Sequence, residues 1–81
     1  MGVNMTADEM MLAAETRRRF RSGEARELRL VAGLTLSEAA AAAGISTTSL
    51  WRYENGHTTP RQAMALAYGR LLERIGREMR R

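Results

Sequence analysis

Glycines and helix-capping residues divide residues 33–56, GLTLSEAAAAAGISTTSLWRYENG, into two short segments. Thr35 with Glu38 three positions later forms a capping box, which predicts that a helix begins directly after Thr35. Gly44 ends that helix, and Ser46 is placed to cap a second one that ends at the last glycine of the segment. Two short helices joined by a glycine-containing turn of this length are typical of a helix-turn-helix.

Helical signals also flank this region on both sides. Thr6 and Glu9 form another capping box, which predicts a helix that begins near Ala7 and is interrupted at a Ser-Gly pair. The sequence leaves open whether this helix merges with the next one, over residues 24–32. Apolar residues recur at helical spacing at Ala25, Leu28 and Val31, and at Leu71, Leu72, Ile75 and Met79 in a last helix. No segment alternates with period two, so we predict an all-α fold, a compact bundle of four or five helices.

Length and composition exclude several functional classes. A chain of 81 residues allows one small domain, and a minimal core or dimerisation must stabilise it. Cysteine is absent and His57 is the single histidine, so disulfides, thiol catalysis and a metal site are not expected. The sequence contains no catalytic constellation and no glycine-rich phosphate loop. We therefore expect neither an enzyme nor a cofactor.

The distribution of apolar and charged residues indicates the kind of partner. No apolar run approaches the roughly 20 residues that span a bilayer, and Asp8 and Glu9 interrupt the N-terminus where a signal peptide needs an apolar core. The expected location is the cytoplasm, without a membrane partner. All 13 basic residues are arginine, and the net charge is +4. Arginine binds phosphate and guanine through paired hydrogen bonds, so this composition favours an anionic partner.

The helix expected after Ser46 has two faces of different chemistry. A turn of 100° per residue places Leu50, Tyr53 and Glu54 together on the side expected to face the core. The opposite face carries Thr48, Trp51, Arg52 and Asn55. Arginine can bond guanine, hydroxyl groups can bond base edges or phosphates, and apolar atoms can contact a thymine methyl group. This outer face is therefore typical of a helix that enters the major groove of DNA.

The stretch LRLVAGLTLSEAAAAAGISTTSLWRYENG resembles the phage-repressor type of helix-turn-helix, the Cro/cI or XRE family. The matching pieces are Arg29, GLT at 33–35, Glu38, Ala40, AGIS at 43–46, Leu50, Tyr53 and ENG at 54–56. The resemblance covers about residues 22–70. It implies a lambda-repressor-like fold and a sequence-specific DNA-binding transcriptional regulator, a repressor that reads a palindromic operator in double-stranded DNA as a homodimer.

The resemblance also implies roles for individual residues. Thr47, Thr48 and Arg52 match positions that face base edges, and Trp51 joins them from its place on the outer face. Asn55 matches a position that contacts phosphate. Arg29 and Glu54 match a partly buried structural ion pair, and an inward-facing carboxylate such as that of Glu54 would be costly without a partner.

Further phosphate contacts are expected around this helix. The candidates are Ser49, His57, Arg61, Arg17, Arg18 and Arg21. The RRRFR run at 17–21 has two readings, a solvated helix end favoured by the macrodipole or a clamp on phosphate. Leu36 departs from the family, which often has glutamine there, so this contact is expected to be lost or replaced by packing.

Several alternatives remain open at the level of the sequence. We divide the chain into an N-terminal extension with a helix, residues 1–21, and a helix-turn-helix domain with a C-terminal helix, residues 22–81. The homodimer surface is either the stripe of Leu71, Ile75 and Met79 or the methionine-rich N-terminal helix, and Trp51 is a further candidate for a dimer contact. An antitoxin that also binds a toxin, or a protein-interaction module that no longer binds DNA, are the alternative functions.

Overall fold

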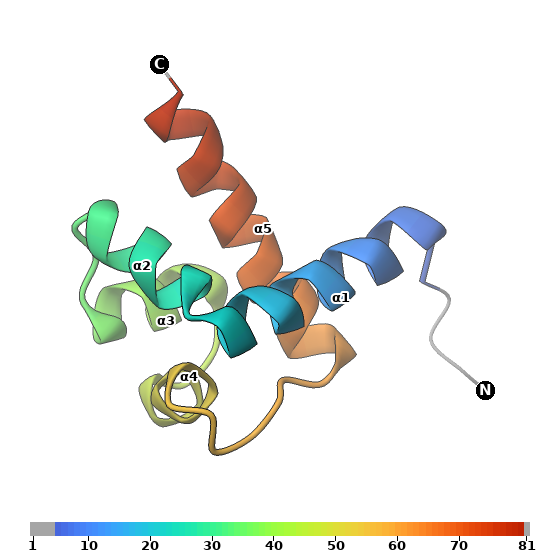
Figure 1. Ribbon diagram of the computed structural model, residues 1–81, viewed down its shortest axis with the longest axis horizontal. Helices are drawn as coiled ribbons and strands as arrows, with labels where there is room; N and C mark the ends of the chain where they lie inside the picture. Colours follow the sequence, from blue (N-terminus) through green and yellow to red (C-terminus); the bar gives the residue numbers. More distant parts are fainter. Residues whose placement is uncertain (1–4, 81) are drawn as a thin grey trace.

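The computed structural model describes residues 5–80, and this part of the chain folds into five helices without a strand (Figure 1). The helices are α1 (Ala7–Ser22), α2 (Glu24–Val31), α3 (Leu36–Ala43), α4 (Thr47–Glu54) and α5 (Gln62–Met79). The long helices α1 and α5 pack against each other, while α2, α3 and α4 gather on one side of them. The predicted all-α bundle is confirmed. Residues 1–4 of the predicted N-terminal extension lie outside the described residues.

The predicted capping signals set the ends of these helices. Thr6 with Glu9, and Thr35 with Glu38, form reciprocal capping boxes with N···O distances between 2.9 and 3.1 Å. Gly23 adopts a left-handed conformation with φ of 87° between α1 and α2. Glycine adopts this conformation at little cost, so the chain turns there. The question that the sequence left open is thereby answered, because α1 and α2 are separate helices.

Aromatic side chains from three helices meet in the core. Phe20 of α1 lies with its ring centroid 5.5 Å from that of Tyr53 on α4 and 5.1 Å from that of Tyr68 on α5. All three side chains are buried, as is Leu50 of α4. Leu50 and Tyr53 therefore form the inner face of α4, as the helical wheel predicts.

In α2 and α5, the apolar periodicity predicted which residues are buried less well than the helical wheel did for α4. Val31 is 62% exposed, because the inner face of α2 continues from Ala25 to Arg29, four residues later, instead of following the three-residue spacing. On α5, Ile75 is buried in the core and Leu71 packs against it. Ile75 is therefore not available for the expected dimer surface, Leu71 is only partly exposed, and Met79 is the exposed residue of that stripe.

A glycine brings α1 and α5 close together. A β-carbon at Gly69 of α5 would overlap the hydroxyl oxygen of Thr16 on α1 and crowd the side chain of Leu12. The Thr16 hydroxyl is itself buried and donates a hydrogen bond of 2.8 Å to the carbonyl oxygen of Leu12. It cannot move away without losing that bond, so the contact between the helices depends on the absence of a side chain at Gly69.

Two glycines of α5 provide a matched test of this contact. Gly69→Ala is expected to lower the free energy of unfolding by about 1–3 kcal/mol, because the added methyl group overpacks a closed interface. Gly76→Ala is the control, since its β-carbon would find no atom nearer than Arg80 Nη1 at 3.7 Å. That change is expected to stabilise the helix by about 0.5–1 kcal/mol. Urea unfolding measures both, and equal effects would contradict the proposed close packing.

The buried hydroxyl of Tyr68 makes stability depend on alkaline pH. The hydroxyl oxygen has no hydrogen-bond partner within residues 5–80, and burial, assisted by the charge of Glu54, raises the pKa of Tyr68 from 10.0 to about 12. Below pH 10 the phenol is neutral in both the folded and the unfolded chain, so stability is unaffected there. As the pH rises from 10 towards 12 the unfolded chain ionises first, and the free energy of unfolding falls by about 2–3 kcal/mol.

Tyr68→Phe should remove most of this alkaline loss. Urea unfolding at pH 9 and pH 11.5 measures the loss in both proteins. At pH 9 the variant should be as stable as the parent or more so, because an unpaired buried hydroxyl is removed. The explanation fails if the variant loses as much stability between the two pH values as the parent does.

Candidate nucleic-acid interface

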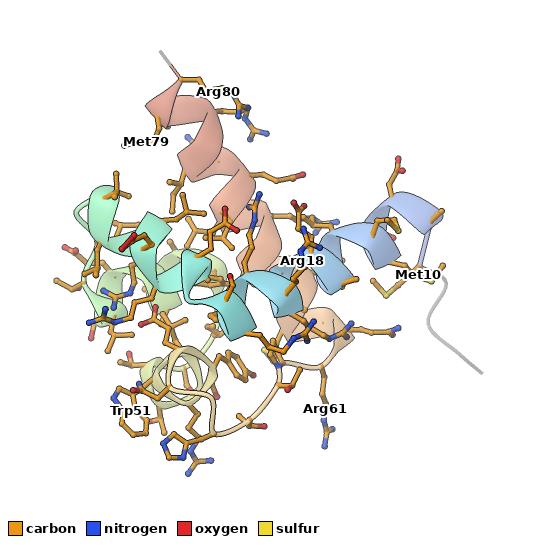
Figure 2. The ribbon with its side chains drawn as sticks, in the orientation of Figure 1. Met10, Arg18, Trp51, Arg61, Met79 and Arg80 are labelled. Atoms are coloured by element: carbon orange, nitrogen blue, oxygen red, sulfur yellow. The ribbon has the colours of Figure 1, made fainter. Side chains whose placement is uncertain are left out.

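Helix α4 carries the candidate base-contacting residues on an exposed face. Its N-terminus is capped by Ser46, whose hydroxyl accepts a hydrogen bond of 3.0 Å from the Ser49 amide and donates one of 2.9 Å to the Ser49 hydroxyl. Thr47, Thr48, Trp51 and Arg52 are all exposed. Figure 2 shows Trp51 pointing away from the bundle at its lower edge. Ser49, in contrast, is partly buried within the cap.

A buried ion pair holds the other face of α4 against α2. The Arg29 guanidinium donates two hydrogen bonds to the Glu54 carboxylate, from Nε to Oε2 at 2.7 Å and from Nη2 to Oε1 at 2.9 Å. A third, from Nη1 to the carbonyl oxygen of Leu34, measures 3.0 Å. The two side chains are only 7% and 2% exposed. The hydrogen bonding to Glu54 raises the pKa of Arg29, so the pair is charged and ties α2, the link after it and α4 together.

Backbone and side-chain hydrogen bonds close the C-terminal end of α4. Gly56 has a φ of 74°, and the amide of His57 donates to the carbonyl oxygen of Arg52 at 2.9 Å. The side-chain amide of Asn55 donates to the carbonyl oxygen of Trp51 at 2.9 Å, so this predicted phosphate ligand also serves the helix end. The ring of His57 stacks on that of Trp51, with centroids 5.1 Å apart and an angle of 19° between the planes.

The sequence did not predict the contact between Trp51 and His57. The available signal was the position of His57 directly after Gly56, because the residue that follows a left-handed glycine often contacts the last turn of the helix. The sequence does not specify which side chain of the last turn of α4 His57 contacts. The stack joins Trp51, which was proposed to contact bases, to His57, which was proposed to contact phosphate.

The end of α1 lies beside the loop that follows α4. Arg17 Nε donates a hydrogen bond of 3.0 Å to the carbonyl oxygen of Pro60, and Arg17 and Arg21 line a cleft together with that loop. The loop residues of the cleft include Asn55, Gly56, Thr58 and Thr59. Two of the three arginines proposed from the RRRFR run are therefore close to the C-terminal end of α4.

Arg18, the remaining arginine proposed from that run, faces a different surface. Arg18 Nη2 lies 3.6 Å from Glu15 Oε2, and Arg18 lines a separate hollow with Asp8 and Glu73. Figure 2 shows Arg18 away from the edge of the molecule that carries Trp51 and Arg61. The prediction that Arg18 joins the phosphate contacts beside α4 does not fit this geometry, because it is rotated about 100° around α1 from Arg17.

Arg61 occupies the N-cap position of α5 at the same edge of the molecule as Trp51 (Figure 2). It is exposed, no side chain caps this helix end, and the first turn contains no acidic residue. The partial positive charge of the helix N-terminus is therefore added to that of the guanidinium. Leu36, at the position where the family often has glutamine, packs against the core.

Acidic side chains are absent from the exposed part of this surface. Glu54 is the single acidic residue between positions 39 and 72, and it is buried against Arg29. The exposed charges contributed by α4, the following loop and the start of α5 are therefore positive. A surface with this charge and this set of hydrogen-bonding groups is suited to a polyanion.

The fold and its exposed second motif helix define a helix-turn-helix protein. A family model described as helix-turn-helix domain matches residues 22–81, and the chain belongs to this family. The matched range begins at the last residue of α1. Neither the curated proteins nor the solved structures contain a match to the chain. Between residues 5 and 80, no cluster of three His, Cys, Asp or Glu side chains could hold a metal ion, and no helix is long and apolar enough to cross a membrane.

The buried ion pair should respond differently to single and double substitution. Glu54→Ala is expected to cost about 3–5 kcal/mol of unfolding free energy, because it leaves the Arg29 guanidinium buried without its partner. The double change Arg29→Met with Glu54→Leu should cost less than Glu54→Ala, since no charge is then left unpaired. Glu15→Ala is the control, because its contacts to Arg18 and Arg19 are more open to solvent than the Arg29–Glu54 pair, so this change should cost less than about 1 kcal/mol.

Urea unfolding of the three variants measures these differences. A cost for Glu54→Ala as small as that of Glu15→Ala would show that the ion pair contributes little to holding α4.

Proposed function

We propose that this chain is a sequence-specific DNA-binding transcriptional regulator of the Cro/cI (XRE) type that inserts α4 into the major groove. One observation carries the proposal. The exposed face of α4 presents hydroxyl groups, an arginine and an indole, while its only carboxylate is buried and neutralised by Arg29. Because this acid is held inward by Arg29, α4 presents no carboxylate that would repel DNA phosphates.

The proposed base contacts come from four side chains. The side chain of Arg52 has no hydrogen bond or ion pair within the described residues, so its guanidinium is available for guanine O6 and N7. Thr47 and Thr48 lie at the N-terminal end of α4, where a recognition helix approaches base edges. Trp51 offers apolar atoms for a thymine methyl group.

Phosphate contacts are proposed for the cationic groups that flank α4 on both sides. Arg61 lies at the uncapped start of α5, and Arg17 and Arg21 line the cleft beside the loop. Asn55 and Ser49 are weaker candidates, because each already makes a hydrogen bond within α4 or its cap. Such contacts set the register of the protein on the duplex without reading the sequence.

A single α4 contacts only a few base pairs, so we propose that the protein acts as a homodimer on a palindromic operator, as a repressor. The dimer surface must come from side chains that the monomer leaves exposed. Met10 and Met11 on α1 and Met79 at the end of α5 meet this condition, whereas Ile75 is buried and Leu71 is only partly exposed. Residues 22–81 supply the DNA-binding unit. Helix α1 lies before this range and shares only Ser22 with it.

Selection from a randomised library of double-stranded DNA tests this function. The parent protein should enrich one motif, and an inverted repeat with half-sites about one helical turn apart would support the homodimer. Arg52→Ala should weaken binding to the enriched site by about 1–3 kcal/mol and relax preference at one position of each half-site. The measurement is fluorescence anisotropy of labelled DNA over a range of salt concentrations.

Two other arginines serve as comparison and control. Arg61→Ala should weaken binding to all sequences alike and reduce the slope of log affinity against log salt by about one. Arg80→Ala removes the same charge at the far end of the molecule and should change neither affinity nor preference (Figure 2). If the parent enriches no sequence at low salt, DNA reading is excluded and a protein-interaction module becomes the better description.

A further inference from the structure

The chain has one tryptophan and one histidine, and the structure stacks them on each other. Trp51 is 46% exposed on the outer face of α4. Trp51 is not among the buried residues of the core. The imidazole of His57, at a centroid distance of 5.1 Å, is the ring that covers one of its faces.

The backbone places His57 in this position independently of its side chain. The amide of Gly56 donates to the carbonyl oxygen of Tyr53 at 3.4 Å, and that of His57 to Arg52 at 2.9 Å. These two bonds form the Schellman arrangement at a helix end, in which the second residue after the cap often makes an apolar contact with the last turn. Here that contact is made by an ionisable ring, and its partner is the exposed indole of Trp51.

From this geometry we propose that His57 is a positioning residue that fixes the indole of Trp51 against DNA. The inference rests on the proposed function. A flat ring stacked on the indole restricts its rotation, so less conformational freedom is lost when Trp51 contacts a base or sugar. Protonation of the imidazole turns the stack into a cation–π contact, which strengthens it, and adds a positive charge beside the phosphates.

Glu54 is the single acidic residue between positions 39 and 72, the segment that contains His57. Arg52 lies on α4, Arg61 at the start of α5, and Arg17 and Arg21 at the end of α1, where they line a cleft with the residues on either side of His57. The nearest acid in the sequence, Glu54, is buried in its bond to Arg29. DNA affinity should therefore rise as the pH is lowered from 8 to 5.5.

The first arm of the test reads the stack without DNA. Because Trp51 is the only tryptophan, its fluorescence reports on His57 directly, and a protonated imidazole in contact with an indole quenches its emission. The emission of the parent should fall when the pH is lowered from 8 to 5.5, because protonation of histidine in this range quenches a stacked indole. His57→Phe and His57→Gln should not show this decrease. Equal emission of the parent at the two pH values would overturn the stacking in solution.

The second arm measures affinity for the selected DNA site at pH 5.5 and pH 8. The parent should bind about three- to tenfold more tightly at the lower pH. His57→Ala should bind about tenfold more weakly than the parent at pH 5.5, the upper end of the effect of an aromatic pair. His57→Phe keeps a ring without a charge, so it should match the parent at pH 8 and lose the pH dependence.

The three variants separate positioning from a simple charge contact. All keep the backbone amide that bonds to Arg52, and circular dichroism verifies that they fold. If His57→Phe binds as weakly as His57→Ala at pH 8, the ring does not act through Trp51 and the proposal is wrong. If His57→Ala binds as tightly as the parent while Arg52→Ala loses preference, the proposal fails and the proposed function stands. If the parent itself prefers no DNA site, both fail.

Discussion

The paired hydrogen bonds between Arg29 and Glu54 are the interaction on which the arrangement of the helix-turn-helix depends. Burying two charges is costly, and the cost is offset only where geometry is good and the remaining donors are satisfied. Here two bonds of 2.7 and 2.9 Å join the groups, and a third reaches the Leu34 carbonyl oxygen between α2 and α3. The same bonds remove the only carboxylate of α4 from the exposed surface. One interaction thus orients α4 and gives its outer surface the charge that DNA requires.

Helix α1 completes the structure, although the family match begins only at its last residue. Phe20 fills the space between Tyr53 and Tyr68, and the bond from Arg17 to Pro60 holds the loop that connects α4 to α5. The close contact at Gly69 fixes α1 along α5. A domain of this size has few residues to bury, and the additional helix increases its core. It also brings two arginines to the end of the proposed recognition helix.

The sequence predicted those features that depend on residues a few positions apart. Capping boxes at Thr6 and Thr35 and the left-handed glycine at Gly44 act through bonds to their own neighbours, so these helix ends follow from local chemistry. The family resemblance named Arg29 and Glu54, and the structure places them in direct contact. Which face each helix buries could not be read as well. Val31 and Ile75 have similar apolar character and opposite exposure, because burial depends on where another helix crosses.

The same distinction, between features set by neighbouring residues and features set by the position of other helices, applies to the arginines of α1 and to the stacked rings of Trp51 and His57. Arg17 and Arg18 are neighbours in the sequence, yet one contacts the loop after α4 and the other faces Glu15, since successive residues of a helix point about 100° apart. Helix α4 has only eight residues, and isolated helices of this length are not stable in water. Its shape therefore depends on the Ser46 cap, on the bonds at Gly56 and on the burial of Leu50 and Tyr53. The DNA contacts proposed for its outer face consequently depend on inner and terminal residues that need never contact a base.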